Sequence, residues 1–271
     1  MDYIRAPFNY PGGKYATLNR LIPLFPDGIG TMVDLFGGSF SVGMNVKAEH
    51  VVYNDLNRDM FQLQKAFRTM KYGSIVGYVE RKIGEWSLSG WDRTGFNGFR
   101  KHFNRNHAHP LDLYVLMCFS HNHQPRWNDK MQYNARHGAN LEMWDMKLRK
   151  RLHTYTHFIE YRSVEFKNED FREYDTKNLT GDDFIYLDPP YYLTGYPYNG
   201  MWSKSDEENL IRFINELEDK EIPYGISRIM SYNGYENKEF QDFINQKQTI
   251  EIHDIRDRNG LCEKYMTNKK I

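Results

Sequence analysis

The sequence of 271 residues is poor in cysteine and has no long hydrophobic run. Its two cysteines, Cys118 and Cys262, have no metal-ligand spacing and fit a reducing compartment. No apolar run approaches the roughly 20 residues of a membrane span, and residues 1–5 show no signal-peptide pattern. We therefore expect a soluble, cytoplasmic protein that binds no membrane. This length can bury the core of one domain, or of one domain with a large insertion.

The sequence also lacks the motifs that cradle phosphates. It contains no Gly-x-Gly-x-x-Gly, and Gly12-Gly13-Lys14 lacks the glycine that stands five residues before the Gly-Lys pair of a P-loop. A nucleoside cofactor without phosphates is therefore favoured over ATP or NAD. No cluster has the ligand spacing of a zinc site, so we expect no metal.

Net charge is zero, but the charges are unevenly distributed. Residues 93–157 hold 11 Lys and Arg against 4 Asp and Glu, and they include eight of the ten histidines. A neutral protein with one basic segment suits a polyanion bound at one place. The alternative is a solvated basic surface.

The hydrophobic pattern predicts an α/β domain interrupted by an insertion. Short apolar runs at 31–36, 50–53, 183–187 and 222–226 predict buried strands, and 56–70 predicts a helix. A second helix is expected at 205–217, where Ser205 can cap it and Glu208 stands at the capping-box position. Residues 250–255 and 265–268 could form a terminal antiparallel pair. Residues 71–157 break this alternation, with a clear helix only at 111–119 and a hairpin or loop at 124–138.

Asp188-Pro189-Pro190-Tyr191 follows a predicted buried strand, and so lies where α/β folds bind ligands. The prolines fix the backbone and remove two donors, which frees carbonyl groups to face a ligand. A carboxylate and a proline carbonyl offer two acceptors, which match the two hydrogens of an exocyclic amine, and the Tyr191 ring offers a flat face for a base. Acceptors that draw on these hydrogens would favour attack by the weakly nucleophilic amine of adenine. The alternative is a plain Pro-Pro turn.

Two further elements suit a cofactor. Asp34-Leu-Phe-Gly-Gly38 places glycines after a strand, where the backbone can approach a ligand closely. Asn54-Asp55 ends the next strand, where an acid can accept hydrogen bonds from ribose hydroxyls. A strand followed by two glycines is common, so this element alone is weak evidence.

Five motifs in this order resemble the alpha-class (Dam-type) DNA adenine methyltransferases. They are Tyr10-Pro-Gly-Gly-Lys14, Asp34-Leu-Phe-Gly-Gly38, Asn54-Asp55, Asn168-Glu-Asp-Phe171 and Asp188-Pro-Pro-Tyr191. Tyr198-Asn199 with Trp202-Ser203 resembles the bacteriophage branch. The resemblance covers about residues 7–268. It implies a Rossmann-like, S-adenosylmethionine-dependent methyltransferase fold, with a catalytic domain of residues 1–70 and 158–271. An inserted, mainly helical target-recognition domain with a hairpin would span 71–157.

The resemblance also implies roles for single residues. Tyr10 and Lys14 would close over S-adenosylmethionine, Phe36 and Gly37 beside Asp34 would line its pocket, and Asp55 would hold its ribose. Asp170 and Phe171 would hold its adenine. Asp188 would lie between the methyl donor and the target amine, with Pro189, Pro190 and Tyr191 completing the catalytic element. The alternative for Lys14 is a solvated lysine beside a turn.

The resemblance places the DNA-binding hairpin within the basic segment. Its expected contacts are Arg126, Asn128, Lys130, Asn134, Arg136 and His137. Arg126 is our candidate base reader, since arginine can grip guanine with two hydrogen bonds; a phosphate contact is the alternative. The family's Pro-Phe-Gly reads Arg136-His137-Gly138 here, and His121 or Asn122 stands where an aromatic wedge is usual. These departures leave open whether the target is a GATC-like site. Ser39 in place of a third glycine is conservative.

The expected function is therefore methylation of adenine in double-stranded DNA. Two rivals are an RNA adenine methyltransferase and a catalytically silent DNA-binding protein of the same fold, although the presence of Asp188 and Lys14 speaks against the silent protein. A cytosine C5 enzyme is disfavoured, because neither cysteine follows a proline. We expect a monomer or weak dimer in a bacterial cell or phage-infected host. A separately acting cognate restriction endonuclease, phage self-protection and regulation all stay open as settings.

Overall fold

The computed structural model describes residues 2–138, 143–191, 202–247, 250–258 and 261–269. Its centre is one mainly parallel sheet with the strand order β3-β2-β1-β4-β5-β8-β7. Strands β1 to β5 pair in parallel, β8 runs antiparallel between β5 and β7, and the short β6 pairs with β5. The strands are β1 (Ile29–Asp34), β2 (Ala48–Asn54), β3 (Val164–Lys167), β4 (Phe184–Leu187), β5 (Tyr224–Tyr232), β6 (Tyr235–Glu236), β7 (Glu251–Arg258) and β8 (Leu261–Thr267). This strand order, with helices on both faces, matches the α/β, Rossmann-like arrangement that the sequence predicts.

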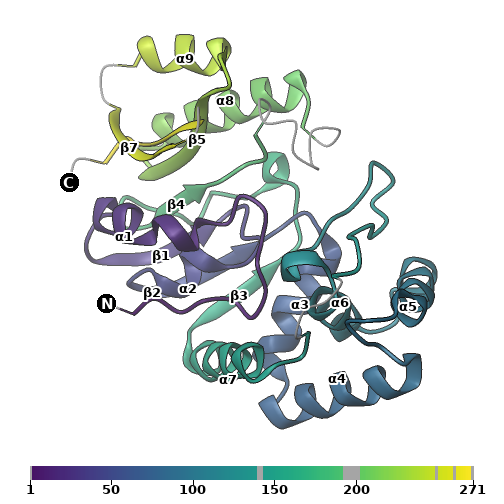
Figure 1. Ribbon diagram of the computed structural model, residues 1–271. Helices are drawn as coiled ribbons and strands as arrows, with labels where there is room; N and C mark the ends of the chain where they lie inside the picture. Colours follow the sequence, from purple (N-terminus) through teal and green to yellow (C-terminus); the bar gives the residue numbers. More distant parts are fainter. Residues whose placement is uncertain (1, 139–142, 192–201, 248–249, 259–260, 270–271) are drawn as a thin grey trace.

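The helices cover both faces of this sheet (Figure 1). The α-helices are α1 (Leu18–Leu21), α2 (Ser41–Asn45), α3 (Arg58–Thr69), α4 (Tyr72–Trp86), α5 (Arg93–Asn106), α6 (Pro110–Cys118), α7 (Met146–Tyr161), α8 (Lys204–Asp219) and α9 (Lys238–Asn245). Short 3-10 turns are η1 (Lys14–Thr17), η2 (Ile22–Leu24), η3 (His121–His123) and η4 (Phe171–Glu173).

Strand residues alternate between two hydrophobic cores, as the pleat of a sheet requires. On β4, Phe184 and Tyr186 face the core that contains α1, α3, α6 and α7, whereas Ile185 and Leu187 face the core beneath α8 and α9. Both faces of β4 are therefore buried, which fits its uninterrupted apolar sequence. Such a strand holds the residues that follow it in a fixed position.

The helices of the insertion do not form a separate hydrophobic unit. Phe96 of α5, Leu113 of α6 and Leu152 of α7 belong to the same buried cluster as Met32 of β1. Helix α3 packs against α6 and α7, and so joins the sheet to the insertion. The segment 124–138, where the sequence predicts a hairpin, is thus carried on a support that is continuous with the core of the sheet. The boundaries of the predicted recognition domain, 71–157, stay a prediction.

The structure confirms the predicted strands, the helices near 56–70 and 111–119, and the terminal antiparallel pair. One local prediction was wrong. Helix α8 is capped by Ser203 with Asp206 in a reciprocal capping box, and not by Ser205 with Glu208. Both pairs have the same spacing, and the helix begins at the earlier one because Ser203 and Asp206 satisfy each other's backbone donors. Within the described ranges, no helix is long and apolar enough to cross a membrane.

Candidate active site

A cavity of about 580 Å³ opens where β1, β2 and β4 reach their carboxyl ends. This size lies in the range of small-molecule sites. The sites predicted from separate motifs meet here: the cavity is lined by Tyr10, Lys14, Asp34, Phe36, Gly37, Asp55, Asp170, Phe171, Asp188, Pro189, Pro190 and Tyr191. Every predicted catalytic and cofactor residue therefore faces one space.

The glycine loop is held against the end of β2. A Cβ atom on Gly37 would lie 2.4 Å from the Tyr53 ring, so only glycine fits there. The Gly38 amide donates to Asp55 Oδ2 at 2.7 Å, and the Asn57 amide donates to Asp55 Oδ1 at 2.8 Å. Burial raises the pKa of Asp55 to about 6, although these amides oppose the rise. Asp55 thus shapes the loop as well as facing the cavity.

Asp34 lies deeper, at the end of β1. Its Oδ2 accepts from the Gly43 amide at 2.9 Å, and its side chain is buried. Burial raises the pKa of Asp34 to about 8, and the neighbouring carboxylates Asp188 and Asp55 add to the rise. Its hydrogen bond anchors α2 to β1, which is a structural role that the motif alone did not indicate.

Three aromatic rings pack against one another on one wall of the cavity and form an aromatic cluster. The Phe36 and Phe171 ring centroids are 5.4 Å apart, and Trp202 lies 5.6 Å from Phe171 and 6.0 Å from Phe36. Trp202 is buried just before Ser203, the N-cap residue of α8, and its Nε1 donates to Glu207 at 2.7 Å. Such apolar faces suit a flat heterocycle. Trp202 was not predicted as a site residue; Tyr198 and Asn199, which the sequence grouped with it, lie outside the described residues.

Asp170 lies beside this aromatic cluster, and its carboxylate already accepts hydrogen bonds from Arg172. Its Oδ1 accepts from the Arg172 amide at 2.9 Å and from Arg172 Nε at 2.8 Å. Hydrogen bonds from Arg172 lower the pKa of Asp170. Arg172 also reaches Asp206 on α8 at 3.2 Å. Asp170 therefore faces the cavity as part of an ion-paired group with Arg172 and Asp206.

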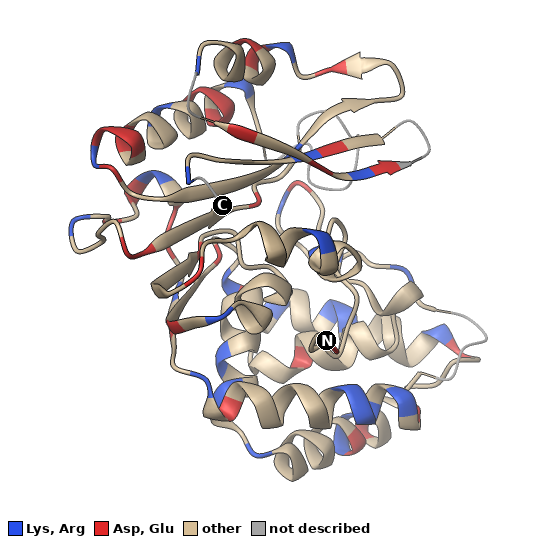
Figure 2. Cartoon of the chain, turned by 90° about the vertical axis from the view of Figure 1, so that its left-hand side faces the viewer, with Lys and Arg blue, Asp and Glu red and all other residues tan. Residues whose placement is uncertain are grey.

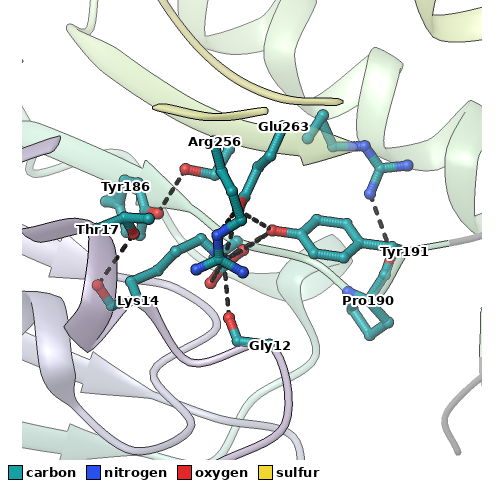
Figure 3. A network of polar contacts seen from close by, with 11 residues as sticks. Gly12, Lys14, Thr17, Tyr186, Pro190, Tyr191, Arg256 and Glu263 are labelled. Carbon is teal, nitrogen blue, oxygen red and sulfur yellow. Dashed lines mark hydrogen bonds and ion pairs between the residues drawn. The ribbon is translucent and has the colours of Figure 1, made fainter. Parts of the chain in front are cut away.

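Lys14 joins the glycine-rich entrance to the Asp-Pro-Pro-Tyr element. Its Nζ lies 2.6 Å from both carboxylate oxygens of Asp188, 2.7 Å from the Tyr191 hydroxyl and 3.2 Å from Glu263 Oε1 (Figure 3). The Lys14 and Glu263 side chains are 2% exposed, whereas Asp188 is 16% exposed because it faces the cavity. Lys14 is thus a buried partner of the Asp188 carboxylate, and the solvated-lysine alternative is excluded.

The buried charged residues of this cluster shift one another's pKa values. Burial raises the pKa of Asp188, Lys14 lowers it and Glu263 raises it, and the net shift is upward. Burial would lower the pKa of Lys14, but the two carboxylates leave it raised. Glu263 lies on β8, and neither it nor Arg256 on β7 was predicted from the sequence. One feature of the sequence could have marked Glu263. It is an acid that alternates with the apolar residues Leu261 and Tyr265 on one face of the last strand.

A second buried ion pair supports the Asp-Pro-Pro-Tyr element. Arg228 of β5 pairs with Glu207 of α8, and both are almost fully buried. Arg228 Nη1 donates to the Pro190 carbonyl at 3.0 Å, and Asn237 donates to Glu207 at 3.1 Å. These residues fix the backbone of the Asp-Pro-Pro-Tyr element. They too were missed, because nothing local in the sequence marks them.

The predicted DNA-binding residues lie on a hairpin that projects beside α6 (Figure 1). Trp127 bridges Tyr133 and Ser120 bridges His137 in antiparallel fashion, which resolves the hairpin-or-loop alternative in favour of a hairpin. Arg126, Lys130 and Arg136 are exposed.

The other three predicted DNA contacts have structural partners. Asn128 Oδ1 accepts from the amides of Lys130 and Gln132, and so closes the tip. The Asn134 backbone amide donates to the Arg126 carbonyl at 2.8 Å, whereas its side-chain Oδ1 is buried without a hydrogen-bond partner among the described residues. The His137 ring nitrogen lies 2.7 Å from the Ser89 carbonyl. At the tip, Met131 lines the cavity of the active site.

Lys and Arg are spread over the helices at the bottom of Figure 2, where the insertion lies. Not all of them are available to a ligand. Arg151 donates to the carbonyls of Ala6 and Phe8 and so holds the N-terminal segment, while Arg149 pairs with Glu80. Lys147 and Lys150 are exposed on α7. The basic cluster that follows the hairpin is therefore partly structural.

Known proteins with similar sequences are modification enzymes. The chain is 38% identical over 247 residues to the modification methylase StsI of Streptococcus sanguinis, and 34% identical over 243 residues to the type II methyltransferase M.FokI of Planomicrobium okeanokoites. It is 29% identical over 248 residues to the modification methylase LlaI of Lactococcus lactis subsp. lactis. These alignments cover 88–89% of this chain but only 37–39% of the relatives, so the chain spans under two fifths of their length.

The sequence profile of one enzyme family matches almost the whole chain. The match runs over residues 10–258, from Tyr10 beside the cavity to the end of β7. It therefore includes the glycine loop, the insertion and the Asp188 element, whose side chains the structure brings together. The chain belongs to the D12 class N6 adenine-specific DNA methyltransferase family.

Proposed function

We propose that this chain transfers a methyl group from S-adenosylmethionine to the exocyclic amine of adenine in duplex DNA. The observation that carries the proposal is that Asp188, a mostly buried acceptor at the end of β4, shares one cavity with the aromatic cluster and the glycine loop. A donor with a flat base and a target amine can thus meet at one carboxylate.

The residues of the cavity fit this cofactor. The cavity-facing side of the cluster of Phe36, Phe171 and Trp202 would contact its adenine, and Asp55 faces the same space where a ribose hydroxyl can donate. The acid-rich lining suits a cationic ligand without phosphates. When bound, S-adenosylmethionine supplies an electrophilic methyl group on a sulfonium. Asp34 would act at a distance, by anchoring the loop.

The two acceptors for the target amine can be assigned. Asp188 supplies the carboxylate. Because Arg228 occupies the Pro190 carbonyl, we assign the second acceptor to the carbonyl of Pro189. As the amine attacks, its nitrogen gains positive charge, and these oxygens would stabilise that charge more than they stabilise the ground state. The methylated amine then releases a proton.

We place the chain in the alpha class of the family on the order of its motifs. The insertion would bind the duplex through the exposed Arg126, Lys130 and Arg136, and the target adenine would rotate out of the stack to reach Asp188. The hairpin lies close enough for Met131 to line the same cavity, which supports delivery of the base from that side. The recognition sequence, GATC-like or other, is a matter for mapping.

The printed names of the relatives suggest a setting. Two are modification methylases and one is a type II methyltransferase. We propose that this chain likewise protects DNA from a restriction endonuclease that acts separately. We also propose that this chain acts as a monomer or weak dimer.

The test is to incubate the purified chain with methyl-labelled S-adenosylmethionine and one of three matched nucleic acids. These are duplex DNA, single-stranded DNA and RNA of a common sequence. Mass spectrometry of the released nucleosides should find methyladenine from duplex DNA. Label in RNA alone would support the RNA rival, and cofactor binding without transfer to any of the three would support the silent DNA-binding protein.

A further inference from the structure

Glu263 is a buried carboxylate that packing alone does not require. It lies on β8 with 1% of its surface exposed, between strands β5 and β7. Burial of a second carboxylate beside Asp188 is costly unless both are paired. A neutral residue would fill the same place in the sheet. Buried acids held at such a cost cluster at functional sites.

Glu263 shares two of its contacts, Lys14 and Tyr191, with Asp188. Lys14 Nζ lies 3.2 Å from Glu263 Oε1 and 2.6 Å from Asp188, so the two carboxylates share one ammonium. The Tyr191 hydroxyl lies 2.7 Å from Asp188 Oδ1 and 2.9 Å from Glu263 Oε1. A hydroxyl has one proton and donates it to one carboxylate at a time. Figure 3 shows Lys14, Tyr191 and Glu263 converging on one point.

The outer side of Glu263 is held more loosely. Arg256 Nε lies 3.5 Å from Glu263 Oε2, and its side chain is 33% exposed. Solvent screens this arginine more than it screens Lys14, which is 2% exposed. Glu263 therefore keeps enough charge to compete with Asp188 for Lys14 and for the Tyr191 proton.

We propose that Glu263 is a positioning residue for methyl transfer, which draws Lys14 and Tyr191 partly away from Asp188. This inference rests on the proposed function. Without Glu263, Asp188 would receive the full charge of Lys14 and the full hydrogen bond of Tyr191, and would be a poorer acceptor for the target amine. In the described part of the chain, Asp188 Oδ1 accepts from both Lys14 and Tyr191, whereas Oδ2 accepts from Lys14 only. Oδ2 is thus the oxygen left to accept from the amine.

The proposal predicts a shift in pH dependence with a definite sign. Charged and titratable groups face Asp188 from every neighbouring element: Lys14 from η1, Glu263 from β8, Tyr191 from its own loop, Tyr186 from β4 and Asp34 from β1, with Arg256 on β7 behind Glu263. Within this set, the negative charge of Glu263 raises the pKa of Asp188. Glu263→Gln should therefore lower the pKa of Asp188.

The experiment is single-turnover methylation of duplex DNA across a pH range, with enzyme in excess and labelled S-adenosylmethionine. Glu263→Gln should lower the plateau rate about 10- to 100-fold, the effect of one altered hydrogen bond to a charged group, and should move the acid limb to lower pH. Asp254→Asn is the control, because it removes one negative charge from the exposed face of the same strand pair. It should leave both features unchanged.

Glu263→Asp keeps the charge and should keep the acid limb of the wild type, with part of the rate restored. It also tests the proposal if Glu263→Gln does not fold. A lower plateau with an unmoved acid limb in Glu263→Gln, or a shifted limb in Glu263→Asp, would overturn the positioning role and leave a structural one. A wild-type protein that methylates nothing would instead overturn the proposed function.

Discussion

Arg228 donates a 3.0 Å hydrogen bond to the carbonyl of Pro190 from a side chain that is only 1% exposed. Its charge is balanced by Glu207, which reaches in from α8. The backbone of the Asp-Pro-Pro-Tyr element is therefore fixed by a buried ion pair. This contact is the reason why we propose the Pro189 carbonyl, and not that of Pro190, as the second acceptor for the target amine.

Glu207→Gln should destabilise the protein and loosen the Asp-Pro-Pro-Tyr element. The change leaves the Arg228 charge buried without its partner, which typically costs about 3–5 kcal/mol of unfolding free energy. Urea unfolding measures this loss, and the methylation rate of the folded variant should also fall. The control is Glu239→Gln, which breaks an exposed pair with Lys204 and should cost about 1 kcal/mol or less. Equal stability losses in the two variants would contradict a special role for the buried pair.

Lys14→Met should move the acid limb of the single-turnover rate in the direction opposite to Glu263→Gln. Lys14 lowers the pKa of Asp188, so its removal should raise that pKa and shift the limb to higher pH. The variant should be slower at neutral pH by ~10-fold or more and should recover in part as the pH rises. Limbs that shift the same way in both variants would show that the cluster does not set the charge of Asp188.

Asp34→Asn should become more stable than the wild type as pH rises from about 4 to 8. Folded Asp34 keeps its proton up to a pKa of about 8, whereas its unfolded value is 3.8, so the native state binds more protons between these limits. Wild-type stability falls with pH over this window, by at most about 1.4 kcal/mol per pH unit for one group. Asparagine can still accept from the Gly43 amide. Unfolding free energies that differ by a constant across the window would refute a protonated Asp34.

Arg126→Ala and Lys150→Ala should affect DNA differently. Arg126 is exposed on the recognition hairpin, and loss of a base contact typically costs ~1–3 kcal/mol and relaxes discrimination at one base pair. Lys150 is exposed on α7, where loss of a phosphate contact should weaken all duplexes alike and lower the salt slope by about one. Initial rates on duplexes with each position of the mapped site varied, at two salt concentrations, separate the two. Uniform loss for Arg126→Ala would make it a backbone contact or a structural residue.

Much of the fold could be predicted because buried parallel strands are short apolar runs, as at β1 and β4, and each is followed by polar or turn residues. The catalytic motif could be located because residues after such strands meet at one edge of the sheet. Helices α4 and α5 were not predicted. In α4 only Ile75 and Val79 are buried, and so its periodic signal is weak. In α5, Phe96, Phe99 and Phe103 do share a face, and the pattern could have been read.

The supporting residues could not be predicted in the same way. Glu263, Arg228 and Glu207 reach the site from β8, β5 and α8, and their roles depend on pairings that join residues distant in the sequence. The start of α8 could not be predicted for a related reason. Two candidate capping pairs with the same spacing, Ser203 with Asp206 and Ser205 with Glu208, lie two residues apart in the sequence. Likewise Arg151 reads as part of a basic cluster, but it binds the carbonyls of Ala6 and Phe8.

The central claim is that the carboxylate of Asp188 assists attack by the amine of adenine. The most direct measurement is the single-turnover rate of Asp188→Ala on duplex DNA, with the methylated base identified by mass spectrometry and S-adenosylmethionine binding measured in parallel. The account predicts methyladenine from the wild type, and a fall in rate of at least ~10²-fold in the variant, with the fold and measurable cofactor binding retained. Near-normal methylation of adenine by Asp188→Ala would contradict it.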